Sequence, residues 1–284
     1  MMKELLFTIL AVIIIISCAE KKENTSNTAD PVISAPTNQV VLSSEIQWEK
    51  LNPARGDQSP QAGTVWGDRK GKVPTGFLAK FVDGFSSPPH IHNVTYRAMV
   101  IKGLIHNDDQ NAEKMWMPAG SFWTQPAGAT HITAAKGAEN IAYVEIDNGP
   151  YLVKPIEEAF DNGERPINID KTNLVWLTAA KTKIIDQAKS NVAVAFLWEN
   201  NAMTGNLVKL PTDFDGEIIS DGAQFHAILI AGEAEYFVPQ SKETKSLDPG
   251  SYFTSTGKAK HEIKISKGLE TIIYIRTNGE LKIR

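Results

Sequence analysis

The strongest constraint on the fold is an internal repeat, because whatever this chain folds into must be built twice. Matching residues recur at offsets that drift from 128 to 131 positions, as expected when loops gain or lose single residues. The copies join near residues 150–170, where Asn-Gly and Gly-Pro pairs predict turns. The matches are Trp48 with Trp176, Thr75-Gly76 with Thr204-Gly205, Leu78 with Leu207, Gly103 with Gly232, His131 with His261, and Tyr143 with Tyr274.

Each copy consists of short runs typical of β-strands. The runs are rich in Val, Ile, Phe and Tyr and are separated by Gly, Pro, Asn and Asp, a pattern that indicates a β-sandwich or barrel. Helical periodicity is scarce, and 175–189 is the one stretch expected to hold a short helix. We therefore predict an all-β chain. The clearest runs are 75–81, 96–101, 141–146, 193–197, 226–230 and 270–275.

Composition excludes several classes of protein. Lys and Arg total 29 against 33 Asp and Glu, and this net charge of −4 argues against a nucleic-acid partner, which usually meets a basic stripe. The single cysteine, Cys18, excludes an internal disulfide framework and a cysteine-rich zinc site. Any metal chemistry must therefore come from the six histidines and from carboxylates.

The N-terminus looks like an export signal. Residues 5–16 are apolar, a length typical of a signal-peptide core and too short to span a bilayer comfortably. The sequence Ile15-Ile16-Ser17-Cys18 resembles a bacterial lipobox, which implies a signal peptide over 1–17 and a lipid on Cys18. Ala19 in the next position resembles outer-membrane sorting, so a lipid-anchored protein of the cell envelope is expected, with the outer membrane and periplasm favoured. Residues 18–44 are polar and predict a flexible tether.

Three histidines of the first copy have the spacing of a metal site. Residues i and i+2 of a strand share a face, so His90 and His92 should both face the interior, with Tyr96 beside them. A Pro-x-Gly turn can deliver His131 from another strand. Converging imidazoles suit Fe(II), Zn(II), Mn(II), Ni(II) or Cu(II). The alternative is three histidines packed in a β core without metal. The two motifs read Gly84-x5-His90-x-His92-x3-Tyr96-x6-Gly103 and Gly120-x5-Pro126-x-Gly128-x2-His131.

These spacings resemble the two motifs of the cupin superfamily, in which the first supplies two His and a Glu and the second supplies a third His. The resemblance covers roughly 45–284 and implies two tandem jelly-roll β-barrels, a bicupin of an uncharacterised cupin-like group. It makes 45–150 a metal-binding cupin domain and 151–284 a degenerate second one. The sequence departs from the pattern at Tyr96, where the family has Glu, and at Ala135, where it often has Asn.

The second copy has lost most of the motif. An offset of 129 places Ile219 at the position of His90, Asp221 at that of His92 and Phe225 at that of Tyr96, so only His261 remains. We expect a structural or pocket-closing role for this half. His226 follows the Tyr96 equivalent and should face the opposite side of its strand. His106, beside Asn107, is interpreted as a turn residue and not as a ligand.

Other residues near the motif leave alternatives open. A tyrosine in place of the carboxylate leaves the site more positive and favours anionic ligands; Tyr96 either donates a hydrogen bond in the pocket or only fills space. Gln125 and Glu145 are candidate outer-shell or substitute ligands. The aromatic side chains between the motifs belong either to the core or to an apolar pocket. They are Trp116, Phe122 and Trp123.

Two main functions follow from the resemblance. A three-His site without the carboxylate resembles that of diketone-cleaving cupin dioxygenases, which implies an Fe(II) dioxygenase, with an isomerase or lyase on the same ligands as variants. The alternative is a binding or sensing module similar to the cupin domains of zinc-binding anti-sigma factors; a purely structural envelope protein is a third reading. We expect one divalent transition metal, Fe(II) or Zn(II) before Mn(II) or Ni(II), and a small-molecule ligand. Two fused copies imitate the cupin dimer, which favours a monomer over a homodimer.

Overall fold

The structure, a computed structural model, describes residues 35–186, 191–265, 268 and 270–284. The chain divides into a compact unit, Pro36–Arg284, and an N-terminal part, Met1–Ala35. The expected signal peptide, Cys18 and the tether up to residue 34 lie outside the described residues. Within the described ranges, no helix is long and apolar enough to cross a membrane.

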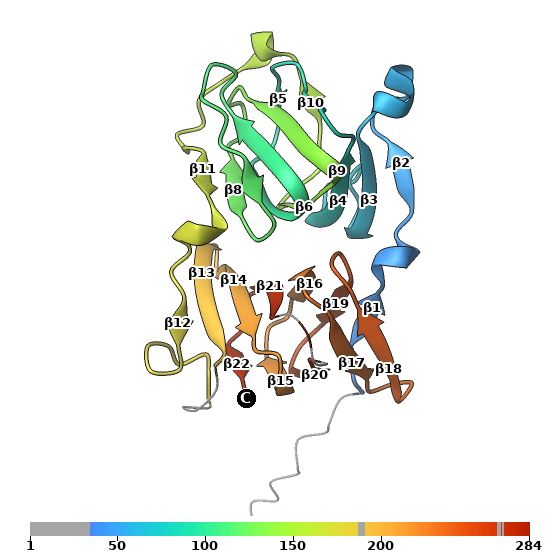
Figure 1. The fold of residues 1–284 in the computed structure, drawn as a ribbon, viewed down its shortest axis with the longest axis vertical. Helices are drawn as coiled ribbons and strands as arrows, with labels where there is room; N and C mark the ends of the chain where they lie inside the picture. Colours follow the sequence, from blue (N-terminus) through green and yellow to red (C-terminus); the bar gives the residue numbers. More distant parts are fainter. Residues whose placement is uncertain (1–34, 187–190, 266–267, 269) are drawn as a thin grey trace, which may run out of the picture. The chain divides into compact units, whose positions relative to one another are not determined.

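The first half of the compact unit is built on one large antiparallel sheet, whose described strands run in the order β11-β8-β6-β9-β4-β3-β2, with β7 paired to β6 (Figure 1). A two-stranded sheet joins β5 to β10. The strands are β2 (Trp48–Lys50), β3 (Gln61–Trp66), β4 (Thr75–Phe81), β5 (Ile91–His92), β6 (Tyr96–Asp108), β7 (Met117–Pro118), β8 (Phe122–Gln125), β9 (Ile132–Ile146), β10 (Val153–Lys154) and β11 (Ile167–Ile169). Short 3₁₀ turns are η1 (Ser43–Glu45), η2 (Pro53–Gln58), η3 (Ile156–Glu158) and η4 (Lys171–Asn173).

The second half has two sheets in its described residues. One runs β1-β19-β16-β21-β14-β13-β12 and the other β18-β17-β20-β15-β22. All-β architecture in two tandem jelly-roll domains is therefore confirmed. The strands are β1 (Gln39–Val41), β12 (Leu177–Thr178), β13 (Ala193–Asn200), β14 (Met203–Leu210), β15 (Asp215–Ser220), β16 (Phe225–Ala231), β17 (Ala234–Val238), β18 (Glu243–Leu247), β19 (Tyr252–Ser255), β20 (Ala259–Lys264), β21 (Thr271–Thr277) and β22 (Leu281–Ile283).

Strand pairing reproduces the sequence repeat. Leu78 of β4 pairs with Tyr143 of β9, and Leu207 of β14 pairs with Tyr274 of β21 at the equivalent point. The matched glycines also adopt the same backbone conformation: Gly103 and Gly232 have φ angles of 75° and 81°, in the left-handed region that favours glycine. The long strand β6 bends at this position, whereas its counterpart breaks into β16 and β17.

Three apolar clusters hold the compact unit together. One lies inside the first half, one lies inside the second half, and the third joins the two halves. The joining cluster includes Met99 and Phe122 from the first half and Leu207 and Ile228 from the second, all nearly inaccessible to water. Because burial of apolar side chains is the main stabilising contribution, the halves should unfold as coupled units.

Two sequence predictions fail at the borders of the halves. The tether prediction is wrong for 39–41, because β1 pairs with β19 and places Val40 opposite Phe253. The helix expected over 175–189 is also wrong for its described part, where Leu177 and Thr178 form β12 at the sheet edge against β13. Tertiary pairing outweighs weak local preference at both places. Strands β10 and β11 follow the predicted boundary at residue 150, yet both pair with strands of the first half.

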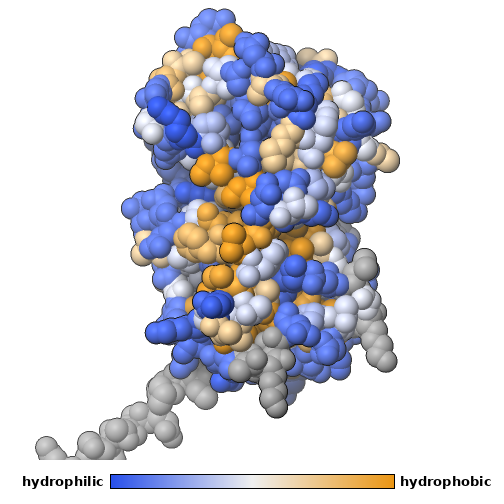
Figure 2. Space-filling view, turned by 60° about the vertical axis from the view of Figure 1, so that its left-hand side comes forward, coloured by the Kyte–Doolittle hydropathy of each residue, from blue (hydrophilic) through white to orange (hydrophobic). Residues whose placement is uncertain are grey.

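One face of the compact unit carries exposed apolar side chains. Figure 2 shows apolar side chains running across the face that brings forward the side of β11, β12 and β13. Ile167 on β11, Val175 before β12 and Phe196 on β13 are each about half exposed or more. Exposed apolar patches often mark interaction surfaces, and no described residue of this chain covers the patch.

Candidate metal centre

The structure brings the three predicted ligands together. One ring nitrogen from each of His90, His92 and His131 lies within 4.8 Å of the other two. The backbones of His90 and His131 form a β-bridge through reciprocal N–H···O bonds of 3.0 Å, which holds the two residues side by side. His92 lies on β5, opposite Val153 of β10. Two strands and one bridge therefore fix all three imidazoles.

Backbone carbonyls orient each ring. Nδ1 of His90 lies 2.9 Å from the Pro88 oxygen, Nδ1 of His92 3.1 Å from the Leu152 oxygen, and Nδ1 of His131 3.2 Å from the Ala129 oxygen. A carbonyl can only accept, so each Nδ1 must carry the proton and each Nε2 must present a lone pair. Metal-ligating histidines usually donate their second N–H in this way.

Burial keeps these imidazoles neutral. Burial lowers the pKa of His131 to about 3, with a smaller contribution from the charge of His90. Burial, then repulsion from the other two rings, holds the pKa of His92 well below its usual value, and burial lowers that of the half-buried His90. A neutral imidazole is the form that binds a metal ion. Three neutral nitrogen donors fit a first-row divalent ion, so the group could hold such a metal.

Tyr96 lies beside the cluster within a hydrogen-bonded network. Its hydroxyl donates to Asn107 Oδ1 at 2.9 Å and lies 3.4 Å from His131 Nε2. Asn107 Nδ2 in turn donates to Gln125 Oε1, and Thr133 donates to Asn107 Oδ1. Burial raises the pKa of Tyr96 far above its ordinary value, so the phenol is protonated. The Tyr96 side chain is thus held by specific polar contacts, and Gln125 contacts the site through Asn107 and through the Ala129 oxygen, which also orients His131.

A second tyrosine, which the sequence analysis missed, faces the cluster. The Tyr151 ring stacks on the His92 ring with centroids 4.3 Å apart, and its hydroxyl lies 3.1 Å from His92 Nε2. Asn93 holds the segment in place by bonding the Pro150 oxygen and the Leu152 N–H. The only sequence signal is a turn just before Tyr151, which predicts a chain reversal without showing where the chain goes.

Glu145 is not near the histidines, so its interpretation as an outer-shell or substitute ligand is wrong. Side chains alternate along β9, so Val144 lines the cavity beside the cluster and Glu145 points to the opposite face of the sheet. There the carboxylate is fully buried between the halves and accepts hydrogen bonds from Tyr143 at 3.1 Å and Tyr274 at 2.7 Å. Arg276 of the second half lies 3.4 Å away and compensates the charge.

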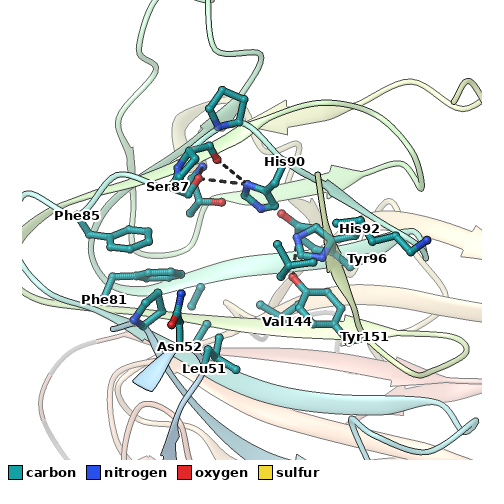
Figure 3. A pocket seen from close by; sticks show the side chains of 18 of the residues that line it. Leu51, Asn52, Phe81, Phe85, Ser87, His90, His92, Tyr96, Val144 and Tyr151 are labelled. Atoms are coloured by element: carbon teal, nitrogen blue, oxygen red, sulfur yellow. Dashed lines mark hydrogen bonds between the residues drawn. The ribbon is translucent and has the colours of Figure 1, made fainter. Parts of the chain in front are cut away.

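The cluster opens into a cavity of about 610 Å³. In Figure 3, His90, His92, Tyr96 and Tyr151 gather on one side, and Phe81 and Phe85 lie on the other with Asn52. Trp123 also lines the cavity, whereas Phe122 packs in the core between the halves and Trp116 lies half-buried beside His106. The lining is mostly apolar, and its size suits a small organic molecule.

In the second half, the positions equivalent to His90 and His92 lie one residue before those predicted from the sequence. His131 pairs with His90, and its counterpart His261 pairs with Ile218, not with Ile219. The residues that replace His90 and His92 are therefore Ile218 and Ser220, both fully buried. A slip of one residue moves every side chain to the other face of a strand, which is why the exposed Asp221 was wrongly placed in the site.

Two further histidines test the remaining predictions. His106 lies buried in β6 and is not a turn residue, because β6 continues past it to Asp108. His226 faces away from the second-half core, as expected, and stacks on Trp66 of the first half with centroids 4.1 Å apart. Within the described ranges, only His90, His92 and His131 form a group able to hold a metal.

Comparison with solved structures identifies the fold. A "putative dioxygenase" from Nostoc punctiforme aligns with a TM-score of 0.65 at 14% identity, covering 86% of this chain and 84% of that one. Oxalate decarboxylase from Lactobacillus farciminis gives a TM-score of 0.57 at 12% identity, covering 88% of each chain. A Bacillus subtilis oxalate decarboxylase, described with Mn(II) centres, gives 0.52 at 11% identity, covering 87% of this chain and 78% of that one. These likenesses support a cupin fold.

The chain also matches a family model. Residues 39–284 match the model described as "Domain of unknown function (DUF4437)". No match was found among curated proteins. The match spans both jelly-roll domains, including β1, so the family unit contains the strand that crosses to the second half.

Proposed function

The chain belongs to the DUF4437 family, and from this premise we propose that it is a metal-dependent enzyme acting on a small molecule. His90, His92 and His131 are the proposed ligands. The observation that carries the proposal is that three neutral imidazoles converge at the end of a small-molecule cavity, with each Nδ1 bonded to a backbone carbonyl. Three protein ligands leave coordination positions open, as catalytic sites require.

Fe(II) or Zn(II) is the proposed metal, with Mn(II) or Ni(II) next. A bound ion of this kind supplies Lewis acidity or activates O₂ or water. Tyr151 is proposed to act on the substrate. Burial keeps its phenol protonated, and the hydroxyl, which lies 3.1 Å from His92 Nε2, can donate to an oxygen anion when a metal takes that nitrogen. Tyr96 already donates its proton to Asn107 and is proposed to line the pocket beside the histidines. The apolar walls exclude water and orient the substrate.

An Fe(II) dioxygenase is the most concrete form of this proposal, with an isomerase or lyase as variants. The three-His set without a carboxylate supports it, and the similar solved structures include one described as a "putative dioxygenase". The same ligands leave the site more positive than a site with a carboxylate would be, which favours an enolate or carboxylate substrate.

The second candidate function is a binding or sensing module without turnover. The observation that favours it is the absence of Asp and Glu from the described residues that line the cavity. A catalyst that moves protons usually has a carboxylate or another base within reach, whereas a binding module needs none.

We also propose that the protein is anchored in the cell envelope through a lipid on Cys18. The lipobox-like sequence before the cysteine supports this proposal. Cys18→Ala should leave the chain without lipid, and a mass spectrum of the variant that still contains acyl chains would contradict the proposal.

Metal analysis of the purified full-length chain tests the main proposal. After incubation with Fe(II), Zn(II) or Mn(II), about one ion per chain is expected, and less than about 0.1 with every metal would overturn it. His90→Ala combined with His92→Ala should abolish uptake, whereas His226→Gln, which removes an imidazole outside the cluster, should not. Oxygen consumption or substrate turnover by the Fe(II)-loaded chain then separates an enzyme from a binding module.

A further inference from the structure

The far end of the cavity is built by a segment that is not part of either sheet. Between β2 and β3 the chain makes an excursion through η2, and Leu51, Asn52 and Arg55 of this excursion line the cavity. Its base is closed by hydrogen bonds from the Leu51 N–H to the Pro60 oxygen and from the Asn52 N–H to Ser59 Oγ. The base of the excursion is therefore closed, and its exposed residues Leu51, Asn52 and Arg55 line the cavity at the end opposite the histidines.

Arg55 has no acidic partner in the described part of the chain. Its guanidinium lies 5.2 Å from the centroid of the Phe85 ring, and Asp57, the nearest acid in sequence, is paired with Lys50. The other five arginines of the chain each form an ion pair with a carboxylate. They are Arg69, Arg97, Arg165, Arg276 and Arg284.

The charge balance of the cavity is positive. Arg55 and Lys154 line it, no described lining residue is acidic, and Lys154 is paired with Glu158 of η3 outside the lining. Arg55 is thus the uncompensated charge. A planar guanidinium can bind a carboxylate through two parallel N–H···O hydrogen bonds, and Arg55 lies over the Phe85 ring beside the cavity.

The middle of the cavity is apolar. Phe77, Ala79 and Val144 lie in the lining with the polar residues of the two ends. Figure 3 shows Asn52 with Phe81 and Phe85 on one side and the histidines on the other. A molecule that fills this space needs an apolar body and a polar group at the far end, where Arg55 lies.

We propose that the cavity binds an aryl or alkyl carboxylate, whose carboxylate is held by Arg55 at the far end and whose opposite end faces the three histidines. The identity of the opposite end rests on the proposed function, because it is there that the metal would act. Recognition by Arg55 needs no metal. This makes Arg55 a specificity-determining residue. Asn52 also lines this end of the cavity and is proposed to contribute to the same specificity.

The test is calorimetric titration of the metal-free full-length chain with 3-phenylpropanoate and with the neutral 3-phenylpropanamide. The acid should bind more tightly, and Arg55→Ala should weaken binding of the acid about tenfold or more while leaving the amide unchanged. Arg55→Lys should retain part of the preference. Arg165→Ala, which removes an arginine outside the cavity, is the matched control and should change neither affinity. Thermal unfolding of each variant verifies that it is folded.

Equal binding of acid and amide, loss of both in Arg55→Ala, or no binding of either compound would overturn the inference. Metal analysis keeps this outcome separate from the proposed function. If the chain takes up metal but shows no Arg55-dependent preference for the acid, only the substrate assignment fails. If the preference is present and no metal binds, the carboxylate site stands and the metal-dependent activity does not.

Discussion

The two halves hold a buried histidine at the same point of the same fold, yet the surroundings of the two rings differ. His131 meets two other imidazoles, and those two, His90 and His92, line the cavity. His261 meets protein on every side: Tyr236 Oη lies 2.7 Å from Nδ1, Ser255 Oγ lies 3.1 Å from Nε2, and the Phe225 ring stacks at 4.3 Å. Asn38, beside β1, reaches the same Nδ1 at 3.2 Å.

This difference shows that the jelly-roll positions a histidine, while neighbouring side chains decide whether it can serve as a ligand. Both ring nitrogens of His261 hydrogen-bond to buried side chains, and no second imidazole or carboxylate of the described residues joins His261 in a group able to hold a metal. In the first half, the Nδ1–H groups donate to backbone carbonyls, and the three imidazoles lie close enough to share one ion. A strand that crosses from the N-terminus completes the filling of the second half.

The largest expected difference between the halves is in metal uptake. His131→Ala should reduce metal affinity by more than about 100-fold, because loss of a ligand costs more than the 10–100-fold typical of its hydrogen-bond partners. His261→Ala should leave uptake unchanged. Metal content after dialysis measures both, and equal loss in the two variants would mean that the site is not where the cluster lies.

The next effect concerns the contact between the halves. Trp66 and Trp198 donate to Tyr143 and Tyr274 in matching geometry, and both hydroxyls then donate to the single carboxylate of Glu145. Glu145→Ala removes this shared acceptor and leaves Arg276 without one of its two carboxylates, so the free energy of unfolding should fall by about 3–5 kcal/mol.

Urea unfolding at pH 7 checks this prediction. Asp57→Ala, which removes an exposed carboxylate from a surface pair, is the control and should have little effect. A Glu145→Ala variant as stable as the parent chain would show that the desolvation free energy of the buried carboxylate cancels the favourable free energy of its hydrogen bonds and ion pair.

A smaller effect is expected from the histidine of the second half. His261→Ala leaves the buried Tyr236 hydroxyl and Ser255 with fewer partners, so stability should fall by about 2–3 kcal/mol. His90→Ala should destabilise the metal-free chain less, since His90 is half-buried at the cavity. The order of the two urea midpoints tests this, and the reverse order would contradict a structural role for His261.

The smallest effect, per group and per pH unit, is a dependence of stability on pH. Burial lowers the pKa of His261 to about 3 and that of His226 to about 4, whereas an unfolded chain has values near 6.5. The unfolded state therefore binds more protons below pH 6.5, and stability is lost as the pH falls from there towards the folded values. Each group contributes up to about 1.4 kcal/mol per pH unit.

Unfolding of the metal-free chain between pH 7 and pH 4 measures this slope. His261→Gln should make it shallower by the contribution of one group. If the slope of stability against pH does not change, other residues must cause the loss of stability in acid, and the three clustered histidines are the first candidates.

The sequence by itself determined the all-β class, the repeat and the residues that come together in the cluster. These follow from local patterns: strands alternate with a period of two, and His90 and His92 share a face whatever the rest of the fold does. The matching pairs of the repeat, such as Leu78 with Leu207, also recur in the strand registers.

The tertiary structure decided what depends on register and on long-range pairing. It placed Ile218, and not Ile219, at the position equivalent to His90. It also placed Glu145 at the contact between the halves and Tyr151 against His92. It also set Arg55 at the far end of the cavity. A one-residue slip or a crossing strand changes nothing in the local pattern of the chain but changes which face a side chain reaches, and only the folded pairing fixes that.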